Sequence, residues 1–170
     1  MDDRAIVAAQ LGRPPRAFSR VAVRCPFGHP AVTEQHPYDD QGRPFPTTYY
    51  LTCRHLVAAI ARVEAAGGVE RWSRRAIEDP LLAESLARAS EEQRSIRHEL
   101  VGEAPLGGGG AALDLGIGGS RSQGSLKCLH AHAAFALARP GYLLGERILA
   151  EVEPLWPTAR CCSEALEASG

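Results

Sequence analysis

A cysteine and two histidines, all of which can bind a metal ion, lie within five positions of one another in the segment KCLHAH, residues 127–132. Cys128 offers a thiolate, and His130 and His132 each offer a ring nitrogen. If the helix has already begun at Cys128, His132 shares its face and His130 points away; if Cys128 precedes the helix, Cys128 and His130 can bind together. We therefore expect one histidine to join Cys128 in a site and the other to pack or to form a hydrogen bond.

Two further cysteines have a histidine close behind them, in the strings CPFGH at residues 25–29 and CRH at residues 53–55. Cys25 and Cys53 each follow a predicted strand, where neighbouring backbone N–H groups can stabilise a thiolate. Tetrahedral zinc accepts sets of four cysteines, of three cysteines and one histidine, or of two of each. We therefore expect Cys25, Cys53 and Cys128 to converge on one ion, although the chain has no CxxC pair, the spacing that identifies zinc sites most securely.

Four interpretations of these cysteines stay open. The first is a zinc site, structural if closed and catalytic if one position is open. The second is an iron–sulfur cluster held by three cysteines and a fourth ligand, as in an electron carrier or a redox enzyme. The third is a thiol protein in which Arg24 or Lys127 favours a neighbouring thiolate, and the fourth is a non-catalytic interaction domain with packed cysteines. The sequence does not decide whether the protein is an enzyme.

The composition is that of an ordinary globular chain. Its 170 residues fit one domain, 1–170, and its 19 basic residues almost balance its 20 acidic ones, so no nucleic-acid partner is expected. No window reaches the roughly 18 apolar residues of a membrane span. The acidic start, MDDRAIVAAQLG, is unlike an export signal, so a cytoplasmic location is expected. Five cysteines in such a reducing compartment point away from disulfides.

The elements that must position these side chains follow from local patterns. Valine-rich and tyrosine-rich runs predict strands over 20–25 and 47–52. Apolar residues at helical spacing after Cys53, and Asp79 followed by Pro80, predict helices that begin at those points. Residues 101–124 are expected to form a glycine-rich loop and residues 157–170 a loosely structured tail. Together these patterns predict an α+β fold, with a small antiparallel N-terminal sheet packed against about five helices.

Four segments together resemble one known family: RCPFGHPAV, PFPTTYYLTC, GIGG and KCLHAH. The resemblance is to a bacterial, largely actinobacterial family, domain of unknown function 501, and it extends from Arg20 to Ala150. It implies no activity. It favours Cys25, Cys53, Cys128 and His130 as the metal ligands over His55 and His132. Arg54 stands where the family pattern has proline.

The same regions predict a pocket for a small anionic molecule. We expect it where the strand ends meet the helix that begins near Cys128, with Arg24, Lys127, Gly118 and Gly119 lining it. Small residues and a cation before a helix N-terminus suit an anion. The segment is not a phosphate-binding P-loop, because GxxxxGK[ST] is absent.

Overall fold

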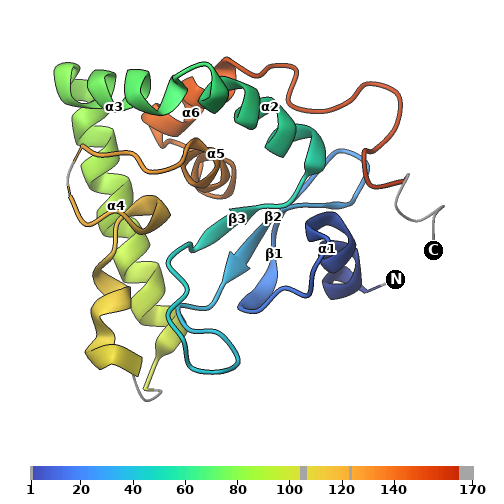
Figure 1. The fold of residues 1–170 in the computed structure, drawn as a ribbon, viewed down its shortest axis with the longest axis horizontal. Helices are drawn as coiled ribbons and strands as arrows, with labels where there is room; N and C mark the ends of the chain where they lie inside the picture. The colour runs from blue at the N-terminus through green and yellow to red at the C-terminus, as the bar shows by residue number, and fades with distance from the viewer. Residues whose placement is uncertain (1, 104–106, 123, 165–170) are drawn as a thin grey trace.

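The fold is α+β, as predicted. The structure, a computed structural model, describes residues 2–103, 107–122 and 124–164. Within them a three-stranded antiparallel sheet at the N-terminal end is combined with six α-helices, one more than the approximate number expected, and with two short 3-10 helices (Figure 1). The elements are α1 (Asp3–Leu11), β1 (Phe18–Arg24), β2 (Pro30–Gln35), β3 (Tyr49–Leu51), α2 (Arg54–Ala65), α3 (Gly68–Glu78), α4 (Pro80–Val101), η1 (Gly107–Asp114), η2 (Ile117–Gly119), α5 (Leu129–Ala138) and α6 (Leu143–Ala150).

The sheet has the order β1-β2-β3, so β2 is its central strand. Val32 of β2 pairs with Val23 of β1 and with Leu51 of β3. Every residue of β2 is buried. This follows from its position, because a central strand has neighbours on both edges and here also receives helices against its face. The sheet therefore holds the residues that follow β1 and β3 close to the first residues of β2.

Helix α5 lies in the middle of the molecule, between the sheet and α6 (Figure 1). Its sequence, LHAHAAFALA, is apolar on nearly all sides, which is typical of a buried helix. The Phe135 ring meets the Tyr49 ring of β3 edge-on, with centroids 5.5 Å apart. Gly145 of α6 allows a close approach from the other side, because a Cβ atom there would lie 2.6 Å from the Cβ atom of Ala136. Helix α5 is therefore packed closely against β3 through Phe135 and against α6 through Ala136.

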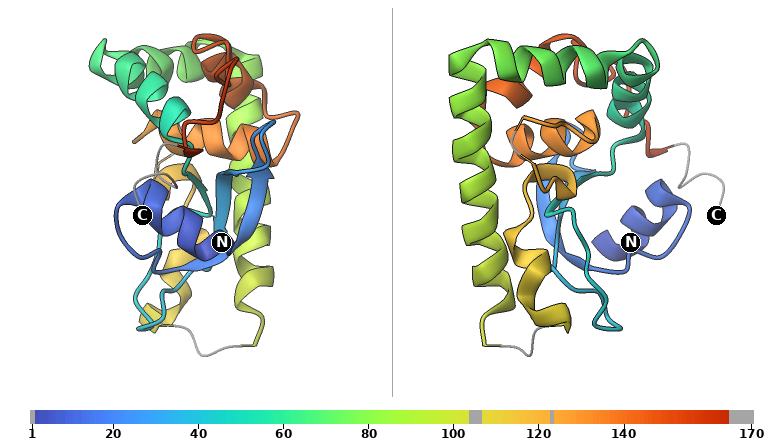
Figure 2. Two further views of the ribbon diagram at one scale, coloured as in Figure 1. Left: turned by 90° about the vertical axis from the view of Figure 1, so that its right-hand side faces the viewer. Right: turned by 60° about the vertical axis from the view of Figure 1, so that its left-hand side comes forward.

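Helix α4 runs along one side of the molecule, and α2 and α3 cross one end of it (Figure 2). Helix α4 begins where the sequence predicted. Pro80 lies in its first turn, and the Asp79 carboxylate accepts hydrogen bonds from the backbone N–H groups of Leu81 and Leu82. None of the helices in the described residues combines the length and apolarity needed to cross a bilayer.

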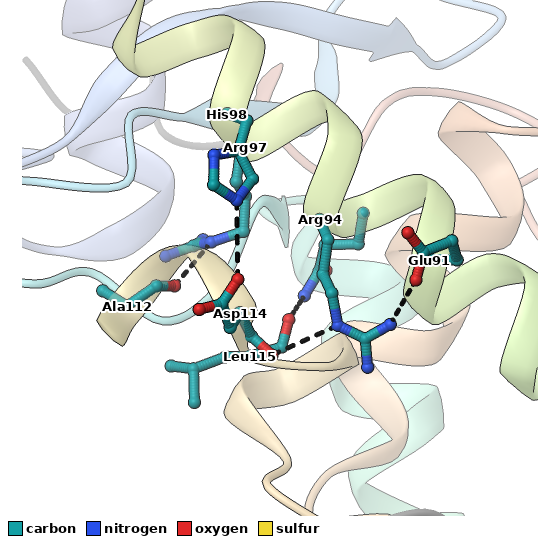
Figure 3. A network of polar contacts seen from close by, with 8 residues as sticks. Glu91, Arg94, Arg97, His98, Ala112, Asp114 and Leu115 are labelled. Atoms are coloured by element: carbon teal, nitrogen blue, oxygen red, sulfur yellow. Dashed lines mark hydrogen bonds and ion pairs between the residues drawn. The ribbon is translucent and has the colours of Figure 1, made fainter. Parts of the chain in front are cut away.

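A fully buried arginine fastens α4 to the segments beside it (Figure 3). Arg97 donates hydrogen bonds to the carbonyl oxygens of Ala112 and Phe45, at 2.9 and 2.8 Å, and to Thr48 Oγ1 at 3.2 Å. Burial lowers the pKa of Arg97 to about 10, which leaves it charged at neutral pH.

The expected glycine-rich loop, residues 101–124, contains two short helices, because residues 107–114 and 117–119 form η1 and η2. In the described part of the expected tail, Cys161 and Ser163 are buried.

Candidate metal centre

Three side chains from α2 and the start of α5 bring ligand atoms together. The three residues are Glu64, Cys128 and His130, and all of them are partly buried. A carboxylate oxygen, the sulfur atom and a ring nitrogen, one from each residue, lie within 4.8 Å of one another. Within the described residues this is the only group of three or more such ligands. A carboxylate oxygen, a thiolate sulfur and an imidazole nitrogen are all zinc ligands.

The backbone at the beginning of α5 places Cys128 and His130 on the same side. Cys128 is the N-cap residue, with extended dihedral angles of φ −159° and ψ 125°, and the helix begins at Leu129. The cysteine therefore precedes the first helical turn, which is the geometry that lets it approach His130 and not His132. If the helix had already begun at Cys128, then His132 and not His130 would lie on the same face as Cys128.

Glu64 joins the group from the last turn of α2. Its Oε1 atom accepts a hydrogen bond from the backbone N–H of Leu129 at 2.6 Å and lies 3.1 Å from His130 Nδ1. The first bond satisfies one of the free N–H groups at the N-terminus of α5. The sequence analysis missed Glu64. The available signal was its position, because an acidic side chain in the last turn of a helix faces the negative end of the helix dipole and needs a partner elsewhere.

The ring of His130 is held through both of its nitrogen atoms. Nε2 lies 3.1 Å from the carbonyl oxygen of Val57, which can only accept, so Nε2 carries a hydrogen and donates it. The pKa of His130 is raised to about 9, chiefly by its hydrogen bond with Cys128, with contributions from Val57 and the Glu64 carboxylate. Without a metal ion, His130 is therefore an imidazolium whose Nδ1–H donates to Glu64.

A cavity of about 540 Å³ adjoins this group, and we call it the Cys128 cavity. Cys128 and His130 form part of its wall, together with residues of α1, β3 and the start of α2. Two residues of the wall, Thr52 between β3 and α2 and Gln10 of α1, have buried polar atoms, Oγ1 and Oε1, without a hydrogen-bond partner among the described residues. Arg54 adds an exposed cation. A buried polar atom without a partner is costly, so these atoms mark positions where a ligand can bond.

The other two cysteines of the expected ligand set lie outside the group. Cys25 Sγ is 3.7 Å from Cys161 Sγ, and Cys53 Sγ is 3.7 Å from Cys162 Sγ. The expectation that Cys25, Cys53 and Cys128 share one ion is therefore corrected, because Cys25 and Cys53 contact the C-terminal segment near the first residues of β2. Burial raises the pKa of Cys53 to about 12 and also raises the pKa of Cys161, so both stay thiols at neutral pH.

The four residues expected to line an anion pocket do not surround the Cys128 cavity. Arg24 forms an ion pair with Asp3, with 2.7 Å between Nη2 and Oδ2. Lys127 is exposed and makes no ion pair within the described part of the chain. Gly118 and Gly119 belong to η2, where positive φ angles of 70° and 77° suit glycine and where a Cβ atom on Gly119 would lie 2.9 Å from Pro46. None of the four contributes to the wall of the cavity.

The second histidine of KCLHAH is buried in the core instead. His132 Nδ1 lies 2.7 Å from the hydroxyl oxygen of Tyr142, and burial lowers the pKa of His132 to about 4. Its Nε2 atom is buried and has no hydrogen-bond partner among the residues that the structure describes. The two histidines thus have different roles, one beside Cys128 and one within the core.

Comparison with known proteins identifies a family but no activity. A family model described as "Protein of unknown function (DUF501)" matches residues 21–150. The search of curated proteins and the search of solved structures return no match to the chain.

Proposed function

The chain belongs to DUF501, a family of proteins of unknown function, and we propose that three of its residues, Glu64, Cys128 and His130, bind one zinc ion. Family membership implies no activity, so the proposal is based on the site alone. These three residues would hold the ion and would leave a fourth position for water or substrate, and two of them, Cys128 and His130, line the Cys128 cavity. Sites of this kind are typical of catalytic zinc, whereas structural sites are closed by four protein ligands. The proposed function is metal-dependent hydrolysis of a small molecule bound in the cavity.

The observation that carries the proposal is the orientation of His130. Histidines that bind metals usually donate their second ring N–H to a carbonyl or carboxylate oxygen, which fixes the ring and its tautomer. His130 donates Nε2–H to Val57 and turns Nδ1 toward Glu64 at 3.1 Å. Nδ1 is therefore the atom that would bind the metal ion, in place of the hydrogen that it carries in the metal-free protein.

The cavity supports an anionic substrate. Arg54 can pair with a carboxylate or phosphate, and Gln10 Oε1 can accept a hydrogen bond from the same molecule. Zinc lowers the pKa of a bound water molecule to about 7 and so supplies hydroxide at neutral pH. The part of this chain is to bind the substrate beside that position and to keep Cys128 and His130 oriented toward it.

Elemental analysis and cobalt substitution test the proposal. We expect one zinc ion per chain, and we expect the cobalt-substituted protein to show the charge-transfer absorption of a thiolate–cobalt bond. Cys128→Ser and His130→Ala should remove both signals, and Glu64→Gln should weaken binding at least about tenfold. Cys162→Ser is the matched control, because this partly exposed thiol lies outside the group. Failure to bind a stoichiometric ion, or full binding by Cys128→Ser, would overturn the proposal.

One observation favours a second candidate, a thiol nucleophile. A ring nitrogen of His130 lies within 4.8 Å of Cys128 Sγ, a separation that suits a thiolate–imidazolium pair, and both residues line the cavity. In acyl transfer Cys128 Sγ would attack the acyl carbon, and His130 would give its proton to the leaving group. A chain that binds no metal, and whose Cys128 is alkylated much faster than Cys162, would favour this candidate over zinc. An iron–sulfur cluster is not proposed, since the group contains a single cysteine.

A further inference from the structure

A second cavity lies on the other side of α5 from Cys128 and His130, and we call it the α4 cavity. Its volume is about 330 Å³, and it is bounded by α3, α4, η2 and the loop that leads to α5. This size lies within the range of pockets that bind small molecules. His132 contributes to its wall, so the two histidines of KCLHAH border two different cavities.

The inner part of the α4 cavity contains an unsatisfied polar atom. His132 is 1% exposed, and its Nδ1 atom is already bonded to Tyr142. Its Nε2 atom has no partner among the described residues. Since nearly all buried polar atoms in proteins are hydrogen-bonded, an orphan on the wall of a cavity indicates the position of a ligand atom.

One wall of the α4 cavity is apolar. Ala76 and Ile77 of α3 and Ala83, Leu86 and Ala87 of α4 form this wall. Ile77 is 69% exposed, which is unusual for a large aliphatic side chain. A ligand with an apolar body would cover it and would gain free energy from removing this surface from water.

The loop that leads to α5 adds polar residues to the wall and carries an unpaired cation. Ser122 and Ser125 present exposed hydroxyl-bearing side chains, and Arg121 makes no ion pair with any residue that the structure describes. Arg94 also lines the cavity, but it is already bonded to Glu91 and to the carbonyl oxygen of Asp114 (Figure 3). Arg121 is therefore the group that is available to bind an anion.

We propose that the α4 cavity binds a small molecule with an apolar body and one anionic group, a carboxylate or a phosphate. The anionic group pairs with Arg121, the apolar body lies against Ile77 and its neighbours, and the far end forms a hydrogen bond with His132 Nε2. This site is separate from the proposed metal site and does not depend on it.

The test uses the full chain and two probes of the same shape, each with a hydroxyl group at the end that would reach His132. They are 6-hydroxy-2-naphthyl phosphate and the uncharged naphthalene-2,6-diol, called naphthyl phosphate and naphthol below. Binding is measured by calorimetry and by nuclear magnetic resonance of isotope-labelled histidine rings. We expect naphthyl phosphate to shift the ring signals of His132 and to bind at least about tenfold more tightly than naphthol. Equal affinity for the two probes, or a shift of His130 in place of His132, would overturn the proposal.

Variants separate the parts of the proposed site. Arg121→Ala should reduce the affinity for naphthyl phosphate to that for naphthol, whereas Arg88→Ala, an exposed arginine elsewhere on α4, should leave it unchanged. Ala87→Phe should abolish binding of both probes, because the larger side chain fills part of the cavity. Ala87 is exposed, so this substitution does not disturb the core. Cys128→Ser should bind naphthyl phosphate normally, which distinguishes this site from the Cys128 cavity. Unchanged binding by Arg121→Ala or by Ala87→Phe contradicts the proposal.

Discussion

The Nε2 atom of His130 lies 3.1 Å from the carbonyl oxygen of Val57, four residues after the N-cap of α2. This contact joins the first turn of α2 to the first turn of α5 and leaves Nδ1 facing Glu64. The two acceptors together fix the orientation of the ring. The contact therefore relates the fold of the two helices to the chemistry that we propose for the site.

Thiol reactivity should distinguish Cys128 from the other cysteines. In the metal-free protein we expect the partly exposed Cys128 and Cys162 to react quickly with a thiol reagent, and the buried Cys25, Cys53 and Cys161 to react slowly. Zinc should protect Cys128 alone, and His130→Ala should remove this protection. The number of fast thiols is read from the absorbance of the released chromophore, and mass spectrometry identifies them. Protection of Cys162 by zinc, or of no thiol, would count against the metal site.

Arg97 should contribute much more to stability than its neighbour Arg94. Arg97→Met leaves three acceptors without their donor, two of them carbonyl oxygens, so we expect the free energy of unfolding to fall by about 3 kcal/mol or more. Arg97→Lys should recover little, because an ammonium group cannot reproduce the planar fork of donors. Arg94→Met is the matched control, with an expected loss below about 1 kcal/mol. Urea denaturation measures all three, and equal losses for Arg97→Met and Arg94→Met would contradict this interpretation.

Acid should destabilise the protein in part through His132. Burial lowers its pKa from 6.5 to about 4 in the folded state. Between these values the unfolded chain binds a proton that the folded chain does not bind, so the free energy of unfolding falls as the pH drops from about 7 to 4, by about 3 kcal/mol in total. His132→Gln should show a shallower dependence over this range in denaturation experiments at several pH values. The same slope in both proteins would show that His132 is not responsible.

Local patterns determined the elements of this protein. The valine-rich run before Cys25 and the tyrosines before Cys53 predicted the outer strands, and Asp79 with Pro80 predicted the start of α4. These features are predictable because capping, turn formation and burial periodicity depend on residues a few positions apart. The small N-terminal sheet and the helices that cover it followed from the same reasoning, and so did the choice of KCLHAH as a place for chemistry.

Only the tertiary structure decided which side chains meet. Glu64 and His130 are 66 positions apart, and Cys25 lies 136 positions from Cys161, which it contacts in place of Cys128. No spacing rule covers such pairs, because they depend on how α2, α5 and the C-terminal segment pack against the sheet. The same packing separated His130 from His132, since the extended backbone of Cys128 and the direction of α5 turned one toward Glu64 and buried the other beside Tyr142. The sequence by itself thus determined the candidates for chemistry, and the long-range packing decided their partners.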